Sequence, residues 1–229
     1  TDTVECQRLV IVDAEGGPLS IRIVAAAMLV AGVLWWAPAG AEASYEEPAP
    51  YEVGNKIVIE QARSVVWDRL VRNLRSDTFR EVKENDGYDI IEVKFESTDP
   101  GNLIDCGRTT RSFAGDNSQR HFEYATADST NYLTQDSKGD SYNVARLSSL
   151  DGRAIVTVKE AQQLTTVTVR VLFSWRIFLE YSDLDGRVSG GNGIIFHFTT
   201  DDPLANDGAG APKCVSKGLL ENRILYHAR

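Results

Sequence analysis

The chain has 229 residues, with 33 acidic and 24 basic side chains and a formal net charge of −9 at pH 7. This acidic balance, without a clustered basic face, argues against a nucleic-acid partner. The length beyond an N-terminal apolar segment suits one domain with a sizeable core rather than two domains.

Residues 1–20 carry acids such as Asp2 and Glu15, where a basic leader is expected, and we predict that this upstream segment is not structural. From Ile23 to Ala41 the chain carries no charge. Its hydrophobic part ends at Trp36, which makes it shorter than the roughly 20 residues of a membrane-spanning helix. Alanines at A-x-A spacing follow. We therefore predict a secretory signal peptide at 21–43 and a periplasmic or secreted location.

Cleavage after Ala43 is the preferred site, with cleavage after Ala39 or Ala41 as alternatives. The competing interpretation is an uncleaved anchor, with Trp35 and Trp36 at the membrane interface. Membrane contact would then occur only through this segment. No cysteine follows the apolar run, so a lipid-modified N-terminus is not expected.

Residues 44–52 contain several prolines and acids without a periodic pattern, which predicts a flexible lead into a single domain over 53–229. An amphipathic helix is expected from Gln61 to Leu74. Its apolar face consists of residues at helical spacing, Ala62, Val65, Val66, Leu70 and Leu74, and Trp67 and Val71 widen this stripe.

Period-two runs rich in β-branched and aromatic residues follow and predict antiparallel strands. Asp86-Gly87 and Asp151-Gly152 are expected hairpin turns. The strand expected over 164–181 is the longest, with Val167, Val169 and Val171 on its buried face. Residues 219–225 suit a short C-terminal helix. The predicted fold class is thus α+β, with one amphipathic helix packed on a predominantly antiparallel sheet.

Three cysteines occur, and Cys6 lies in the upstream segment. Cys106 and Cys214 remain as an even pair in a chain predicted to enter an oxidising compartment, so we expect a disulfide between them. A redox or metal-binding thiol pair is the alternative, but it lacks C-x-x-C spacing and a nearby histidine.

Motifs for serine hydrolases, zinc proteases and nucleotide enzymes are missing from the sequence. His121 and His197 are the histidines considered as bases or ligands. His197 alternates with Phe196 and Phe198, which predicts that it lies on the opposite strand face. We predict no catalytic residues, metal ligands or cofactor.

Four segments carry a family resemblance: 66–70 (VWDRL), 90–93 (IIEV), 101–107 (GNLIDCG) and 214–218 (CVSKG). Together they resemble small bacterial envelope proteins of the BamC type, over about residues 55–110. The resemblance implies a helix packed on a sheet and a scaffolding or assembly role. Members of that type are lipoproteins, whereas this chain lacks the lipid-acceptor cysteine.

The favoured hypothesis is an exported, non-enzymatic bacterial envelope protein that binds an envelope protein partner or supports an assembly, with its oligomeric state left open. The alternative is a carrier that holds an apolar small molecule or lipid between helix and sheet. A hydrolase is a minor alternative. The residues considered for a ligand or partner surface are all aromatic: Trp67, Phe173, Trp175, Phe178 and Tyr181.

Overall fold

The computed structural model describes residues 42–115, 118–203 and 212–229. All of them belong to Pro38–Arg229, one of the two units into which the chain divides. The upstream segment 1–20, and all but the last two residues of the predicted signal peptide, lie outside the described residues and stay predictions. Among the described helices, none has both the length and the apolar character needed to cross a membrane.

The predicted fold class, an α+β domain organised by one helix on a sheet, is wrong. The structure is mostly β, with 55% strand and 16% helix. Strand β9 (Ser141–Ala161) has 21 residues and spans about 70 Å, whereas helix α1 (Arg63–Ser76) has 14 residues and spans about 21 Å. A helix of this length cannot cover such a sheet, so further strands cover the rest of it.

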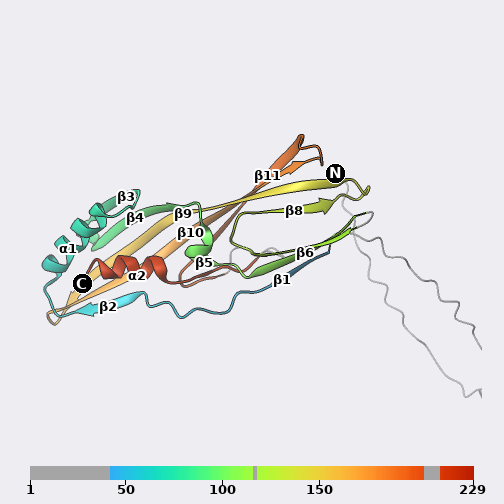
Figure 1. The fold of residues 1–229 in the computed structure, drawn as a ribbon. Helices are drawn as coiled ribbons and strands as arrows, with labels where there is room; N and C mark the ends of the chain where they lie inside the picture. Colours follow the sequence, from blue (N-terminus) through green and yellow to red (C-terminus); the bar gives the residue numbers. More distant parts are fainter. Residues whose placement is uncertain (1–41, 116–117, 204–211) are drawn as a thin grey trace, which may run out of the picture. The chain divides into compact units, whose positions relative to one another are not determined.

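Strands β9 and β10 (Leu164–Ser182) form an antiparallel hairpin that is the spine of the main sheet (Figure 1). Their register runs from the pair Leu164 and Ala161 to the pair Ser182 and Asn143. The connecting residues Gln162 and Gln163 have φ angles of 53° and 65°. Left-handed conformations at both positions of a two-residue loop suit the right-handed twist of paired strands.

The predicted alternation in the spine is confirmed. Val167, Val169 and Val171 are fully buried, whereas Arg170 between them is exposed. One face of β10 therefore belongs to the core and the other faces solvent.

The predicted turn at Asp151-Gly152 is wrong, because β9 runs straight through these residues. Gly152 lies opposite Phe173 of β10 and opposite Phe95 of strand β4 (Ile90–Ser97). A Cβ at Gly152 would lie 2.1 Å from the Leu172 carbonyl oxygen and 3.0 Å from Phe95 Cζ. The glycine thus permits a close approach of neighbouring groups within the sheet.

The neighbours of the spine change midway along its length. At the end nearest the turn, the order is β3 (Glu81–Asn85), β4, β9, β10, β2 (Lys56–Ile59). At the other end, β8 (Thr130–Gln135) pairs with β9, and β11 (Val188–Thr199) pairs with β10. The predicted hairpin at Asp86-Gly87 is confirmed: a 3-10 turn, Asp86–Tyr88, joins β3 to β4.

A second antiparallel sheet has the order β1 (Glu42–Glu46), β6 (Arg108–Gly115), β7 (Ser118–Ala125). Residues 44–46, at the start of the predicted flexible lead, lie in β1. This strand pairs with residues 108–112, so the contacts that order it are distant in sequence.

The predicted disulfide between Cys106 and Cys214 is confirmed, and both residues are fully buried. It lies beside a two-stranded sheet of β5 (Ile104–Asp105) and β12 (Val215–Ser216). A 3-10 turn, Pro100–Asn102, precedes β5. The bridge joins the central part of the chain to the segment that leads into helix α2 (Leu219–Tyr226).

The predicted apolar stripe of α1 is buried at Val66, Trp67, Leu70, Val71 and Leu74, but the prediction is wrong for Val65, which is exposed. The helix begins without a local side-chain cap. Instead, the Arg63 amide donates a 2.7 Å hydrogen bond to Glu160 Oε2 of β9. A carboxylate at this position satisfies a free amide and interacts favourably with the helix dipole.

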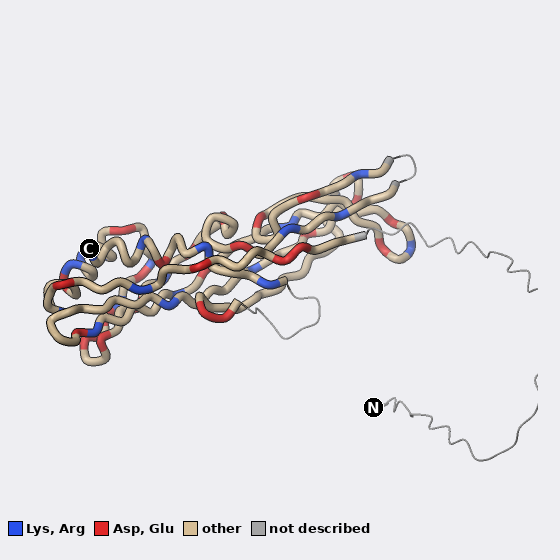
Figure 2. Tube along the Cα trace, turned by 90° about the horizontal axis from the view of Figure 1, so that it is seen from below, with Lys and Arg blue, Asp and Glu red and all other residues tan. Residues whose placement is uncertain are grey.

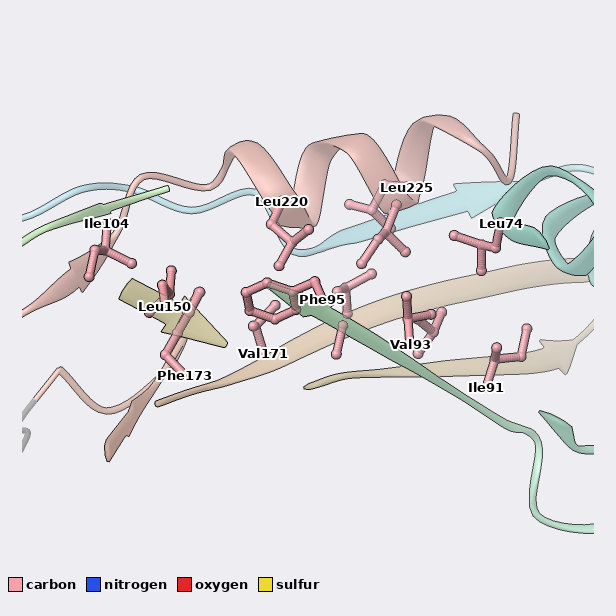
Figure 3. Close-up of a cluster of buried hydrophobic side chains, with 14 of the residues drawn as sticks. Leu74, Ile91, Val93, Phe95, Ile104, Leu150, Val171, Phe173, Leu220 and Leu225 are labelled. Carbon is pink, nitrogen blue, oxygen red and sulfur yellow. The ribbon is translucent and has the colours of Figure 1, made fainter. Parts of the chain in front are cut away.

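The core contains side chains from both helices and from the spine half nearest the turn. In Figure 3, Leu220 and Leu225 of α2 point toward Phe95 of β4, and Leu74 of α1 lies near Ile91 and Val93. All six side chains are buried. The space between the helices and the sheet is therefore filled by the protein's own side chains.

Replacement of Gly152 by alanine is expected to lower the free energy of unfolding by about 2 kcal/mol or more, because the new Cβ meets a backbone carbonyl. Gly190→Ala is the matched control, since a Cβ there has nothing within 4 Å. Its effect should stay within about 0.5 kcal/mol. Urea denaturation measures both, and equal stabilities would contradict the close packing at Gly152.

Loss of the disulfide through the double change Cys106→Ser and Cys214→Ser should lower the free energy of unfolding by about 2–4 kcal/mol. The sequence separation of 108 residues closes a long loop, which restricts the unfolded chain. Denaturation of the variant and of the oxidised parent, followed by fluorescence, provides the measurement. A difference below about 1 kcal/mol would contradict this role.

Candidate functional site

The five aromatic residues considered for a ligand or partner surface do not gather on one surface. Trp67, Phe173 and Trp175 are buried, and Tyr181 is half-buried. Phe178 is the exposed member, with 45% of its surface open.

Two of the buried members, Phe173 and Trp175, belong to stacked aromatic pairs. Phe173 stacks on Phe198 at 4.9 Å between ring centroids, and Trp175 stacks on Phe196 at 5.2 Å. The indole N–H of Trp175 donates a 2.7 Å hydrogen bond to Ser148 Oγ. The rings thus pack against each other within the core, and the indole N–H has a hydrogen-bond acceptor there.

The exposed edge of the main sheet at β11 has an unusual sequence. Its twelve residues, VSGGNGIIFHFT, include no Asp, Glu, Lys, Arg or Pro. Within the described part of the chain, β11 pairs with β10 alone and forms the margin of the sheet (Figure 1). An edge strand presents unpaired N–H and C=O groups, and proteins commonly protect such edges with charges, prolines or bulges.

Apolar side chains surround this edge on the outer face of the sheet. Phe178 lies between Leu147 of β9 and Gly193 of β11, and Ile195 is two residues further along β11. Leu147 is 55% exposed and Ile195 is 47% exposed. These side chains line a shallow hollow of about 370 Å³. We call Leu147, Phe178 and Ile195 the edge patch.

Glycines in β11 allow the Phe178 ring to lie against the strand. A Cβ at Gly191 would lie 2.9 Å from Phe178 Cζ and 2.8 Å from the Leu179 carbonyl oxygen. Aromatic rings commonly cover glycines in this way across neighbouring strands. Through the Phe178 ring, the edge patch thus extends from β10 onto β11, the open margin of the sheet.

Other strands at the margins of the described sheets are charged: β3 reads EVKEN, β1 reads EASYE and β7 reads SQRHFEYA. Strand β8 is also uncharged, but it has half the length of β11. Its Tyr132 is buried and stacks on Tyr124 of β7 at 6.1 Å. The β11 edge is therefore the long uncharged margin.

Ion pairs cover the outer face of the main sheet next to the edge patch, and one of their members, Arg176, lies opposite Ile195 and lines the same hollow. Arg176 lies 2.7 Å from Asp151, and Lys94 lies 2.6 Å from Glu81. Figure 2 shows acidic and basic residues interspersed along the described chain. The edge patch differs from this charged surface in its chemistry.

The two histidines considered from the sequence each contact a serine. His121 Nδ1 lies 3.1 Å from Ser112 Oγ, and His197 Nδ1 lies 3.1 Å from Ser174 Oγ. As predicted, His197 is exposed while Phe196 and Phe198 on either side are buried.

The Ser174–His197 pair lacks the arrangement of a catalytic triad. Asp151 lies beyond Ser174 rather than beyond His197 and forms an ion pair with Arg176. In a serine hydrolase the carboxylate orients the histidine, and backbone amides stabilise the oxyanion. Here Ser174 lies inside β10, and this strand is hydrogen-bonded to β9 on one side and to β11 on the other.

Arg146 of β9 is a buried charge that the sequence interpretation missed. Its Nη2 donates a 2.6 Å hydrogen bond to the Thr126 carbonyl oxygen, and its Nη1 donates to the Asp128 carbonyl oxygen. The guanidinium also lies over the rings of Tyr124 and Trp175, at 5.7 and 5.5 Å. Burial lowers the pKa of Arg146 from its ordinary value. Arg146 is two residues from Val144 and from Ser148, both of which are buried. Because alternate residues of a strand point to the same face, this spacing was the sequence sign that Arg146 points inward.

Asp77, at the end of α1, joins the two helices, and the sequence interpretation also missed this cluster. His227 Nε2 lies 2.6 Å from Asp77 Oδ2, and Arg223 Nε donates to the same oxygen at 2.9 Å. The hydrogen bonds from Arg223 hold the pKa of Asp77 well below its ordinary value. These partners are about 150 residues from Asp77, so no local pattern indicated the contact.

Glu221 of α2 is fully buried. Its carboxylate accepts hydrogen bonds from Thr200 Oγ1 at 2.7 Å and from Ser216 Oγ at 2.9 Å. The side chain thus fixes the start of α2 against the loop after β11. A glutamate in the first turn of an expected helix was the sequence sign of such a contact.

Within the described residues, no group of three or more His, Cys, Asp and Glu side chains is placed to hold a metal ion. Comparison with family models, curated proteins and solved structures finds no match to this chain. The resemblance to the BamC type therefore stays a prediction. The β11 edge and its patch form the candidate functional site.

Asp77→Asn should destabilise the protein by about 2–3 kcal/mol at pH 7, because Arg223 and His227 lose a charged partner. A lowered carboxyl pKa stabilises the fold above the unfolded value of about 4, and this contribution is lost as pH falls toward the folded value. The stability difference between variant and parent should therefore shrink below about pH 4. Denaturation curves at several pH values measure this, and a difference independent of pH would contradict it.

Proposed function

We propose that this chain is an exported, non-enzymatic bacterial envelope protein that binds a protein partner through the β11 edge. The observation that carries the proposal is the twelve-residue uncharged edge strand beside the edge patch. In this binding mode, an extended segment of the partner adds a strand to the sheet. Main-chain hydrogen bonds then provide affinity, and alternate side chains provide specificity.

The two faces of the edge provide different contacts for an added strand. Ile195 lies on the outer face with the rest of the edge patch, and Ile194 points to the opposite face. Both isoleucines are nearly half exposed, at 47% and 44%. An added strand with apolar residues at matching positions would bury them on both faces.

The proposed location rests on the predicted signal peptide and on the disulfide. A buried disulfide between Cys106 and Cys214 is consistent with folding in an oxidising compartment, and in bacteria the periplasm and the extracellular space are such environments.

The packing of the interior favours a binding protein over a carrier. A carrier needs an apolar cavity, whereas Leu220 and Leu225 fill the space beneath α2 (Figure 3). A surface hollow of about 530 Å³ opens near Phe173, but charged residues such as Lys94 and Asp151 line its margin. A lipid tail would find little enclosed apolar surface there.

Photo-crosslinking in living cells tests the proposal. A photoreactive residue at Asn192 in β11 should produce a protein adduct. Ile195→Lys should reduce its yield at least about tenfold, because an added strand would cover the lysine. A probe at Val58, an exposed residue on the short strand β2, is the positional control and should yield little adduct. Absence of a protein adduct at Asn192, or a yield unchanged by Ile195→Lys, would overturn the proposal.

A further inference from the structure

We infer that the strand added to β11 is β11 of a second copy of this chain, antiparallel to the first about a twofold axis. This inference rests on the proposed function and names its partner. Three properties of the edge support it: the charges at its two ends, its uncharged length, and the positions of its isoleucines.

The two ends of β11 carry opposite charges. Arg187 directly precedes the strand, and Asp201 and Asp202 follow it. Antiparallel pairing of two copies places the start of each strand beside the end of the other, so Arg187 of each copy approaches the acids of its partner. Parallel pairing would place like charges together. Asp201 pairs with Arg170 at 3.4 Å, but its side chain remains 55% exposed and open to a further cation.

The uncharged length matters because twofold symmetry places a strand against itself. Any charge near the axis would oppose the same charge of the second copy, which destabilises strand pairs. Two copies with a formal net charge of −9 also repel each other. The stretch from Val188 to Thr199 carries no Asp, Glu, Lys or Arg side chain, so β11 contributes no such pair of like charges where the strands meet.

The isoleucines define the register. Residues directly opposite each other in an antiparallel pair point to the same face, so the axis must pass through a residue position. An axis at Ile195 places the two Ile195 side chains together and Ile194 opposite Phe196. Gly193 then faces His197 of the copy, which leaves room for the Phe178 ring beside it. An axis at Gly193 would instead place Ile195 opposite Gly191 and lose these apolar pairs.

Sedimentation velocity of the purified protein tests the association across roughly three decades of concentration. A monomer–dimer equilibrium is expected. Ile195→Lys should raise the dissociation constant at least about tenfold, because two lysines meet at the axis. Val58→Lys makes a comparable change on β2 and should leave the association unchanged. Circular dichroism and intact mass of the oxidised protein check that both variants fold and retain the disulfide.

Cysteine crosslinking tests the register in a Cys6→Ser background. Ile195→Cys should form a covalent dimer upon mild oxidation, since Cys106 and Cys214 are fully buried in their own bridge. Ser189→Cys is the control, because the two copies of this position lie far apart in the inferred register. Crosslinking at position 189 in preference to 195 would overturn the register.

A monomer at every concentration, or a dimer that Ile195→Lys leaves intact, would overturn the second copy as partner. The photo-crosslinking result separates this failure from failure of the proposed function. A monomer whose Asn192 probe captures a different protein leaves strand addition in place. A monomer whose probe captures no protein overturns both.

Discussion

The pairing of β9 with β10 constrains every other part of the domain. Two strands of about 20 residues keep one register from a tight turn to their far ends, so alternate residues of both must face the same side throughout. That inner face needs cover along its whole length. Helices α1 and α2 cover the half nearest the turn. Strands β6 and β7, together with the 126–129 segment, cover the other half, where Arg146 and Ser148 bind carbonyl oxygens of that segment.

The elements predicted well are those whose causes lie close together in the sequence. Val167, Val169 and Val171 alternate with polar residues, and their burial follows from strand geometry alone. The disulfide followed from there being only two cysteines outside the upstream segment. The helix near residue 63 was also predictable from its spacing. Its buried face was less so, because the sheet beneath it decides which residues of a wide apolar stripe are covered.

The errors arose where distant contacts outweigh a local preference. Asp151-Gly152 has the composition of a hairpin turn, yet the glycine is required because Phe95 and the Leu172 carbonyl approach it inside the sheet. The actual turn uses two glutamines, which have no marked turn preference. Arg146 is buried because aromatic rings and carbonyl groups from other strands surround it. The prediction of the fold class was wrong for a related reason. The length of the spine, rather than the presence of a helix, determines what must cover the sheet.

The edge patch was only partly accessible from sequence. Phe178 was among the aromatic residues considered, but the alternation of side chains along β10 separates it from Phe173 and Trp175, which face inward.

The position of helix α2 in the chain has a consequence for how the protein folds. It follows all the other elements, yet its Leu220 and Ile224 cover the sheet that the preceding elements build. Until residues 214–226 are present, that sheet is incomplete and its apolar face is open to water. Formation of the Cys106–Cys214 disulfide, in which both thiols are oxidised by an external two-electron oxidant of the compartment, therefore marks core closure, and the bridge is a chemical record that the last helix has docked.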